Sequence, residues 1–253
     1  MVIPLKSPRE LDKMRKSGGL AAAVMEKLVA MVREGVTTGE LDAEAERLLQ
    51  EAGAVSASKG YHGYPAHICT SINEEIVHGI PGPRKLQPGD IVSIDLCLKF
   101  DGFFADVAET VAVGEVDAEK KLLISVAKEA LEASIKEARY GNRLFDISHA
   151  IEETARRNGF SVVRKFSGHG IGTQMHEEPP IPNYGKRHTG PKLLPGMTFA
   201  IEAMLNAGTH RVIILDDDWT AVTADARPSA HYEHTVAITA EGPEVLTCRK
   251  NSR

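Results

Sequence analysis

Apolar side chains recur at helical spacing in four stretches of the chain. The first stretch follows Ser7-Pro8-Arg9-Glu10, a capping box with proline at the first helical position, and its period lasts until Gly35. Glycine also follows two later stretches, at Gly53 and Gly159, where it favours a helix end. The pattern predicts helices over about residues 8–34, 38–52, 117–139 and 143–158.

A β-hairpin is predicted after the first pair of helices. Residues 91–98 are rich in β-branched side chains, and residues 103–113 read as a second strand. Between them stands Asp101-Gly102, a strong signal for a two-residue turn. The turn fixes which residues of the two strands lie opposite each other.

This register brings two aspartates together. It sets Asp95 opposite Ala108 and Cys97 opposite Asp106, so Asp95 and Asp106 lie on one face as diagonal neighbours, about 7 Å apart or less between Cβ atoms. Two buried, unpaired carboxylates would repel, whereas a divalent cation makes both charges favourable. Two solvated acids on an exposed strand face are the alternative.

The chain carries an internal repeat. PGDIVSIDLCL at residues 88–98 is echoed by PGMTFAIEAML at residues 195–205, and each copy places one carboxylate, Asp95 or Glu202, at the same internal position. Helix-ending glycines also recur, Gly35 with Gly141 and Gly53 with Gly159, both at an offset of 106 residues against 107 for the strands, and chance rarely produces such agreement. We therefore predict an α+β fold with helices on one face of an antiparallel sheet. Residues 1–253 would form a single catalytic domain of two pseudo-symmetric halves, about 1–115 and 116–253.

Composition narrows the class of protein. A formal charge of −5 is too small and too evenly spread to indicate nucleic acid or an anionic membrane as the main partner. Three widely spaced cysteines argue against a disulfide framework or a structural zinc site. The apolar run at residues 20–25 is too short for a membrane span or a signal core, so we expect a cytoplasmic protein.

Further candidate ligands lie in the second half. His169 and His176 occupy a glycine-rich segment, residues 167–180, in which the backbone can approach a bound group closely. Glu233 begins a strand whose TVAI repeats the TVAV of residues 110–113. Each half would thus offer two carboxylates to one centre.

Five blocks of the sequence resemble the type I methionine aminopeptidases, in their short bacterial form, which have the pita-bread fold. The similarity covers about residues 3–248, and the blocks occur in the family's order and spacing. They are HGIP at residues 78–81, SIDLCLKFDGFFAD at 93–106, GHGIGTQMHEEP at 168–179, IEAMLNAG at 201–208 and YEHT at 232–235.

The resemblance implies a dinuclear metal centre. It implies two divalent ions, of Mn, Fe, Co or Zn, bridged by Asp106 and Glu233, and a metal-bridged water that attacks the scissile carbonyl. Glu202 would shuttle the proton, while His78 and His176 would contact the substrate. The implied metal ligands are Asp95, Asp106, His169, Glu202 and Glu233.

The resemblance also implies a methionine pocket lined by Tyr61, Cys69, Met175 and Trp219. Three positions depart from the family pattern: Met175 replaces the usual phenylalanine, Ser58 a frequent cysteine, and Ala203 the usual proline. Met175 is flexible and apolar, so the pocket should still admit a thioether. We interpret the other histidines as surface or packing residues, with a supporting role for about one in five: His62, His67, His149, His188, His210, His231 and His234.

The implied function is removal of the initiator methionine from nascent proteins and peptides whose second residue is small. An Xaa-Pro aminopeptidase or prolidase is one alternative, although such chains usually carry a further amino-terminal domain. A non-catalytic binding protein of the same fold is another, and it predicts missing ligands. The implied partners are nascent chains, with transient ribosome proximity, and we expect a monomer with no nucleic-acid or membrane partner.

Overall fold

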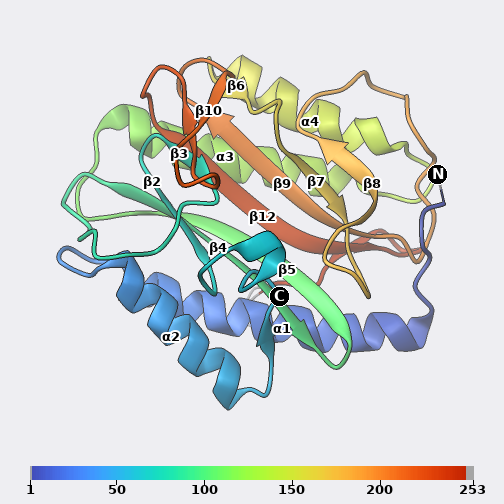
Figure 1. Cartoon of the computed structure of the whole chain (residues 1–253). Helices are drawn as coiled ribbons and strands as arrows, with labels where there is room; N and C mark the ends of the chain where they lie inside the picture. Colours follow the sequence, from blue (N-terminus) through green and yellow to red (C-terminus); the bar gives the residue numbers. More distant parts are fainter. Residues whose placement is uncertain (1, 249–253) are drawn as a thin grey trace.

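The computed structural model describes residues 2–248 (Figure 1). The four predicted helices are confirmed with slightly shorter bounds: α1 Pro8–Met31, α2 Thr38–Glu51, α3 Ala118–Glu137 and α4 Leu144–Arg157. The capping box at Ser7 and Glu10 is present. The first helix ends before Gly35 because Val32 is already extended and the Gly35 amide donates to the carbonyl of Leu86 at 2.9 Å.

A large antiparallel sheet forms the centre of the molecule. Its main path runs β1-β4-β5-β12-β9-β7-β8, with β2 added beside β4, β6 beside β9 and β13 beside β12. A smaller sheet has the order β10-β11-β3. The strands are β1 Val55–Ser56, β2 Cys69–Ile72, β3 Glu75–Val77, β4 Ile91–Phe100, β5 Phe103–Ala112, β6 Ser161–Val162, β7 Ser167–Gly170, β8 Glu177–Pro182, β9 Thr198–Asn206, β10 Val212–Ile214, β11 Ala221–Thr223, β12 Ser229–Ile238 and β13 Pro243–Val245, and one 3-10 turn covers Tyr61–Gly63.

The predicted hairpin register is confirmed in β4 and β5. Asp95 lies opposite Ala108 and Cys97 opposite Asp106. The turn residue Asp101 has a φ of 48° and the following glycine one of 86°, the left-handed pair that a tight hairpin turn requires. Local turn chemistry therefore determines which face each aspartate occupies.

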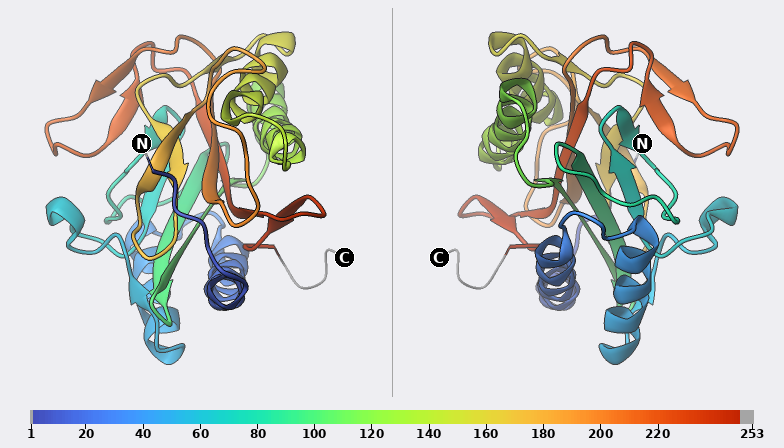
Figure 2. Two further views of the ribbon diagram at one scale, coloured as in Figure 1. Left: turned by 90° about the vertical axis from the view of Figure 1, so that its right-hand side faces the viewer. Right: turned by 90° about the vertical axis from the view of Figure 1, so that its left-hand side faces the viewer.

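Side chains alternate between a helix face and a site face of the central sheet. Toward the helices, Ile94 and Leu96 of β4 pack in one buried cluster with α1 and α2. Ile201 and Leu205 of β9 pack in a second cluster with α3 and α4. Figure 2 shows α3 and α4 on one side of the sheet and the β10–β11 hairpin on the other. The opposite face of β4 and β9 carries Asp95 and Glu202 beside apolar residues such as Cys97 and Met204.

The two halves are related by matching contacts as well as by sequence. An isolated β-bridge joins Thr37 to Lys85 in the first half, and its counterpart joins Arg143 to Lys192 in the second. In both halves, a carboxylate three residues further on accepts the backbone N–H of the residue before the helix. The predicted pseudo-symmetric halves around an antiparallel sheet are confirmed. Within residues 2–248, no helix has the length and apolarity needed to cross a membrane.

Candidate active site

Three carboxylates lie in one row across the middle of the sheet. Cys69 of β2 is opposite Asp95 of β4, and Asp95 is opposite Ala108 of β5. Ala108 is opposite Glu233 of β12, which is opposite Glu202 of β9. Because direct cross-strand partners project to the same face, all three carboxylates point away from the helices.

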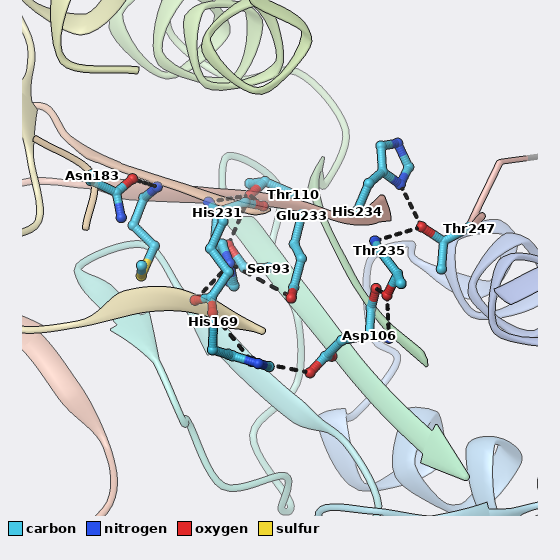
Figure 3. A network of polar contacts seen from close by, with 12 residues as sticks. Ser93, Asp106, Thr110, His169, Asn183, His231, Glu233, His234, Thr235 and Thr247 are labelled. Carbon is cyan, nitrogen blue, oxygen red and sulfur yellow. Dashed lines mark hydrogen bonds and ion pairs between the residues drawn. The ribbon is translucent and has the colours of Figure 1, made fainter. Parts of the chain in front are cut away.

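Asp106 and His169 complete the cluster one alternation away (Figure 3). Asp106 precedes Ala108 by two residues on β5, so it shares that face. The Nε2 atom of His169 lies 3.9 Å from Oδ2 of Asp106 and 3.6 Å from Oε1 of Glu202. Its Nδ1 lies 2.9 Å from the carbonyl oxygen of Gly170. A proton on Nδ1 would satisfy that carbonyl and leave Nε2 free as a ligand.

The arrangement fits divalent metal ions. Ligand atoms of Asp106, His169 and Glu233 all lie within 4.8 Å of one another. Oδ1 of Asp106 and Oε1 of Glu233 are buried and have no hydrogen-bond partner among the described residues. Orphaned buried oxygens of this kind are costly unless a cation occupies the space between them. Mostly oxygen ligands with one imidazole suit Mn²⁺, Fe²⁺ or Co²⁺ and still permit Zn²⁺.

The electrostatics of the carboxylates also favours a site for divalent metal ions. Burial, followed by the charges of neighbouring carboxylates, raises the pKa of Asp95, Glu202 and Glu233 well above ordinary values. Burial raises the pKa of Asp106 to about 6. Four ionised carboxylates at this spacing are therefore unfavourable in the protein alone, and added positive charge would reverse that balance.

A cavity of about 310 Å³ opens onto the carboxylate row. The loops around the site face supply its walls, while the strands supply its floor. It is lined by all eleven residues that the sequence assigned to metal, catalysis or substrate binding, which are Tyr61, Cys69, His78, Asp95, Asp106, His169, Met175, His176, Glu202, Trp219 and Glu233. The structure thus brings the predicted residues into one space, whatever role each one has.

Two histidines of the cavity wall, His176 and His78, contact aromatic neighbours. The Tyr61 hydroxyl lies 2.8 Å from Nδ1 of His176, whose ring stands edge-on to His169 at 4.3 Å between centroids. His78 has an unusual φ of 62° and stands edge-on to Trp219 at 6.2 Å. Burial, and then the charge of His176, lower the pKa of His78 to about 4, so His78 is neutral at pH 7. Burial also lowers the pKa of His176.

Sequence reasoning missed Tyr64, which also lines the cavity. Its buried hydroxyl donates to the carbonyl oxygens of Ile68 and Gly79 at 3.1 and 2.9 Å. Its ring stands edge-on to Trp219, with 5.0 Å between centroids. Tyr64 therefore fixes one apolar wall. No local sequence pattern distinguishes it from an ordinary core tyrosine.

His231, predicted to be a surface or packing residue, lies beside the carboxylate row. It is buried, and its Nε2 lies 3.7 Å from Oε2 of Glu202 and 3.9 Å from Oε2 of Glu233. Burial lowers the pKa of His231 to about 3, so its ring is neutral. The structure therefore favours the packing alternative over the surface one for this residue. The signal was strand alternation, because His231 precedes Glu233 by two residues and shares its face.

Two of the three departures from the family pattern touch the cavity. Met175 and Ser58 line it. Ala203 is fully buried in the helix-facing cluster with α3 and α4, on the opposite side of β9 from Glu202. A change at position 203 therefore reaches the site only through the backbone.

Comparison with known proteins agrees with this geometry. The model of metallopeptidase family M24 matches residues 12–240. A methionine aminopeptidase of Clostridium perfringens is 48% identical, covering 98% of this chain and 100% of its own length. The crystal structure of methionine aminopeptidase from Rickettsia prowazekii superposes with a TM-score of 0.96 at 39% identity, covering 98% of this chain and 100% of that one. The Thermotoga maritima methionine aminopeptidase structure gives a TM-score of 0.95 at 42% identity, with coverage of 97% and 99%. The predicted pita-bread fold is confirmed.

More distant structures share only the fold. Prolidase from Pyrococcus horikoshii has a TM-score of 0.78 at 20% identity. The superposition covers 98% of this chain but 64% of the prolidase. The methionine aminopeptidase structures, in contrast, match this chain at higher identity and over their full length.

Proposed function

Because the chain belongs to metallopeptidase family M24, and within it to the methionine aminopeptidases, we propose that it hydrolyses the first peptide bond of nascent proteins and peptides that begin with methionine. One observation carries this proposal. Four carboxylates and one imidazole converge on the floor of a cavity whose walls are largely apolar and aromatic. Such a cavity suits a substrate with a cationic amino terminus and an unbranched apolar side chain.

We assign the metal ions to the carboxylate row. Asp95, Asp106, His169, Glu202 and Glu233 would hold two divalent ions, whose charge of +4 balances the four carboxylates. Such ions supply Lewis-acid activation of water and of the scissile carbonyl. The free α-amino group of the substrate would be held at this centre, which would limit removal to one residue at a time.

Glu202 is assigned the proton transfer. Its carboxylate lines the cavity beside His169 and His231, where it would act as a base and then as an acid. It would take a proton from the attacking water and deliver that proton to the departing amine. One carboxylate thus serves both steps.

His176 is assigned the stabilisation of negative charge on the carbonyl oxygen. If the Tyr61 hydroxyl donates to Nδ1, the proton of the neutral ring stands on Nε2, which can donate to that oxygen. The neutral ring of His78 can accept a hydrogen bond from the substrate's peptide N–H. Tyr61 is thus a positioning residue for the histidine that contacts the substrate.

The methionine side chain is assigned to the space among Tyr61, Cys69, Met175 and Trp219. Burial raises the pKa of the Cys69 thiol, which stays neutral and offers a small, polarisable wall. Trp219 and Tyr64, which stand edge-on to each other, add aromatic surface to the cavity wall. A linear thioether fits such a slot better than a β-branched or charged side chain does.

The test uses protein stripped of metal with a chelator and reloaded separately with Mn²⁺, Fe²⁺, Co²⁺ or Zn²⁺. Peptides beginning Met-Ala, Met-Leu and Ala-Pro are offered to each form. We expect release of methionine, fastest from Met-Ala. Cleavage of Ala-Pro alone would replace the proposal with a prolidase-like activity, and metal binding without any cleavage would indicate a binding protein.

We further propose that residues 1–253 act as one catalytic domain and as a monomer. Support comes from the site itself, since both halves of a single chain supply its residues. Nascent chains as substrates would place the enzyme in the cytoplasm and close to the ribosome. Light scattering tests whether the protein is a monomer. Co-sedimentation with translating ribosomes tests whether it lies close to the ribosome.

A further inference from the structure

We propose that Lys6 and Glu177 are positioning residues for the reaction. They would hold the loop of residues 171–176, here called the histidine loop, so that Met175 and His176 face the cavity. The inference rests on the proposed function for its kinetic consequence. The contacts themselves link the amino-terminal segment, which reaches α1 from the β8 side of the molecule (Figure 1), to a loop more than 160 residues later.

The link is a buried ion pair. The Nζ atom of Lys6 donates to Oε2 of Glu177, and the two side chains are 4% and 7% exposed. The pair between Lys13 and Asp101 is different, with side chains 45% and 43% exposed. Exposed pairs contribute little, whereas removal of one partner from a buried pair leaves an uncompensated charge.

The second oxygen of Glu177 holds the beginning of the histidine loop. Oε1 accepts the backbone N–H groups of Thr173 at 2.8 Å and Gln174 at 3.2 Å. The Thr173 hydroxyl lies 3.3 Å from the same oxygen. The Glu177 carboxylate therefore closes the turn of residues 173–177, which carries Met175 and His176.

Lys6 is fixed at both its backbone and its side chain. Its backbone N–H donates to the carbonyl of Gly196 at 2.7 Å. Its side chain crosses Gly172 so closely that a Cβ there would lie 2.2 Å from Cε of Lys6 and 2.7 Å from Oε1 of Glu177. Gly172 is in turn anchored to β5, because its carbonyl accepts the N–H of Phe104 at 2.8 Å. The lysine side chain thus occupies the space next to the histidine loop and limits its movement.

His176 is the residue directly before Glu177, so a shift of the carboxylate moves the histidine. Its ring is set between Tyr61 and His169, where a displacement of about 1 Å would misplace a hydrogen-bond donor for the reaction. The five proposed metal ligands lie on strands, and of these only His169 adjoins the pair, through Gly170, the β7 partner of Glu177. We therefore expect a loss of kcat with little change in metal affinity.

The experiment compares Lys6→Met with Lys13→Met, the same substitution at the exposed pair. Because Lys6→Met leaves a buried charge, the double variant K6M/E177Q, in which both partners are neutral, is measured beside it as the form expected to fold. Hydrogen–deuterium exchange is followed at the amides of Thr173 and Gln174. Methionine release from a Met-Ala peptide is measured after reloading with Mn²⁺, and Mn²⁺ affinity is measured by calorimetry.

We expect both Lys6 variants to exchange these amides at least tenfold faster and to lose about tenfold or more in kcat, with smaller changes in KM and Mn²⁺ affinity. Lys13→Met should match the wild type. Wild-type exchange and kcat in the double variant would overturn the proposal, as would a fall in Mn²⁺ affinity in step with kcat. A wild-type protein that released no methionine would overturn the proposed function instead, while the exchange rates would still decide whether the pair holds the loop.

Discussion

Glu202 and Glu233 are direct cross-strand partners at the centre of the sheet, so two acidic side chains face the same side from adjacent strands. Like charges in this position destabilise a sheet. Burial makes the repulsion stronger, and it raises the pKa of both groups. The protein tolerates the pair because the same geometry creates a cation site.

Metal removal should therefore lower thermal stability. At a free ion concentration about 100 times Kd, binding contributes about 2.7 kcal/mol, which corresponds to a rise in Tm of about 5–10 °C for a chain of this size. Scanning fluorimetry with and without Mn²⁺ measures the shift. Asp106→Asn should abolish it, while Asn at the exposed Asp216 should not; an equal shift in both variants would place the ions elsewhere.

Glu202→Gln should separate binding from turnover. The amide keeps the size of the side chain but cannot move a proton, so kcat should fall by about 10²–10⁴-fold. Calorimetry with a Met-Ala peptide should show nearly unchanged peptide affinity, and Mn²⁺ titration controls for loss of a ligand. Near-normal turnover would remove Glu202 from the proton transfer.

His176→Ala should lower kcat by about 10²–10³-fold while KM changes less, because the lost hydrogen bond is strongest to the developing oxyanion. Tyr61→Phe should have a smaller effect in the same direction. Steady-state kinetics on Met-Ala peptides measure both. A change confined to KM would assign His176 to ground-state binding.

His231→Leu should weaken Mn²⁺ binding by about 10–100-fold, because its ring is the neutral polar group next to Glu202 and Glu233. Gln at the same position can donate a hydrogen bond and should recover most of the affinity. Leu at the exposed His210 is the control. Calorimetry gives the Mn²⁺ affinities. Equal Mn²⁺ affinities for all three variants would mean that His231 contributes only to packing.

Substitution by alanine should have opposite effects on folding stability at two glycines, Gly168 and Gly19. A Cβ on Gly168 would lie 2.4 Å from the carbonyl oxygen of Ala200, so Gly168→Ala must displace β7 and should cost about 2 kcal/mol or more. No atom lies within 4 Å of a Cβ on Gly19 in α1, so Gly19→Ala should stabilise by about 0.5–1 kcal/mol. Urea unfolding of both variants provides the comparison, and stabilisation by Gly168→Ala would contradict the close packing of β7.

The local chemistry of the chain predicted much of this site. The turn at Asp101-Gly102 determines the hairpin register, so the sequence alone was enough to assign Asp95 and Asp106 to one face. The repeat between the two halves then indicated Glu202. These predictions succeeded because they depend on residues close in sequence or on direct internal similarity.

Relationships between distant segments could not be predicted in the same way. The pairing of Glu202 with Glu233 depends on β12 entering between β5 and β9, which no short pattern encodes. The burial of His231 follows from that same pairing. Lys6 resembles any surface lysine until the fold brings it to Glu177, because the partner lies in the other half of the chain.

The position of β12 also has a consequence for biosynthesis. Of the strands in residues 2–248 only β13 follows it, yet β12 lies in the interior of the sheet and joins the first half to the second. Until residues 229–238 have been synthesised, β5 and β9 each present an unpaired edge, and the two halves of the metal centre have no shared floor. An enzyme proposed to act on proteins as they emerge would therefore assemble its own catalytic centre only after its β12 strand has been synthesised.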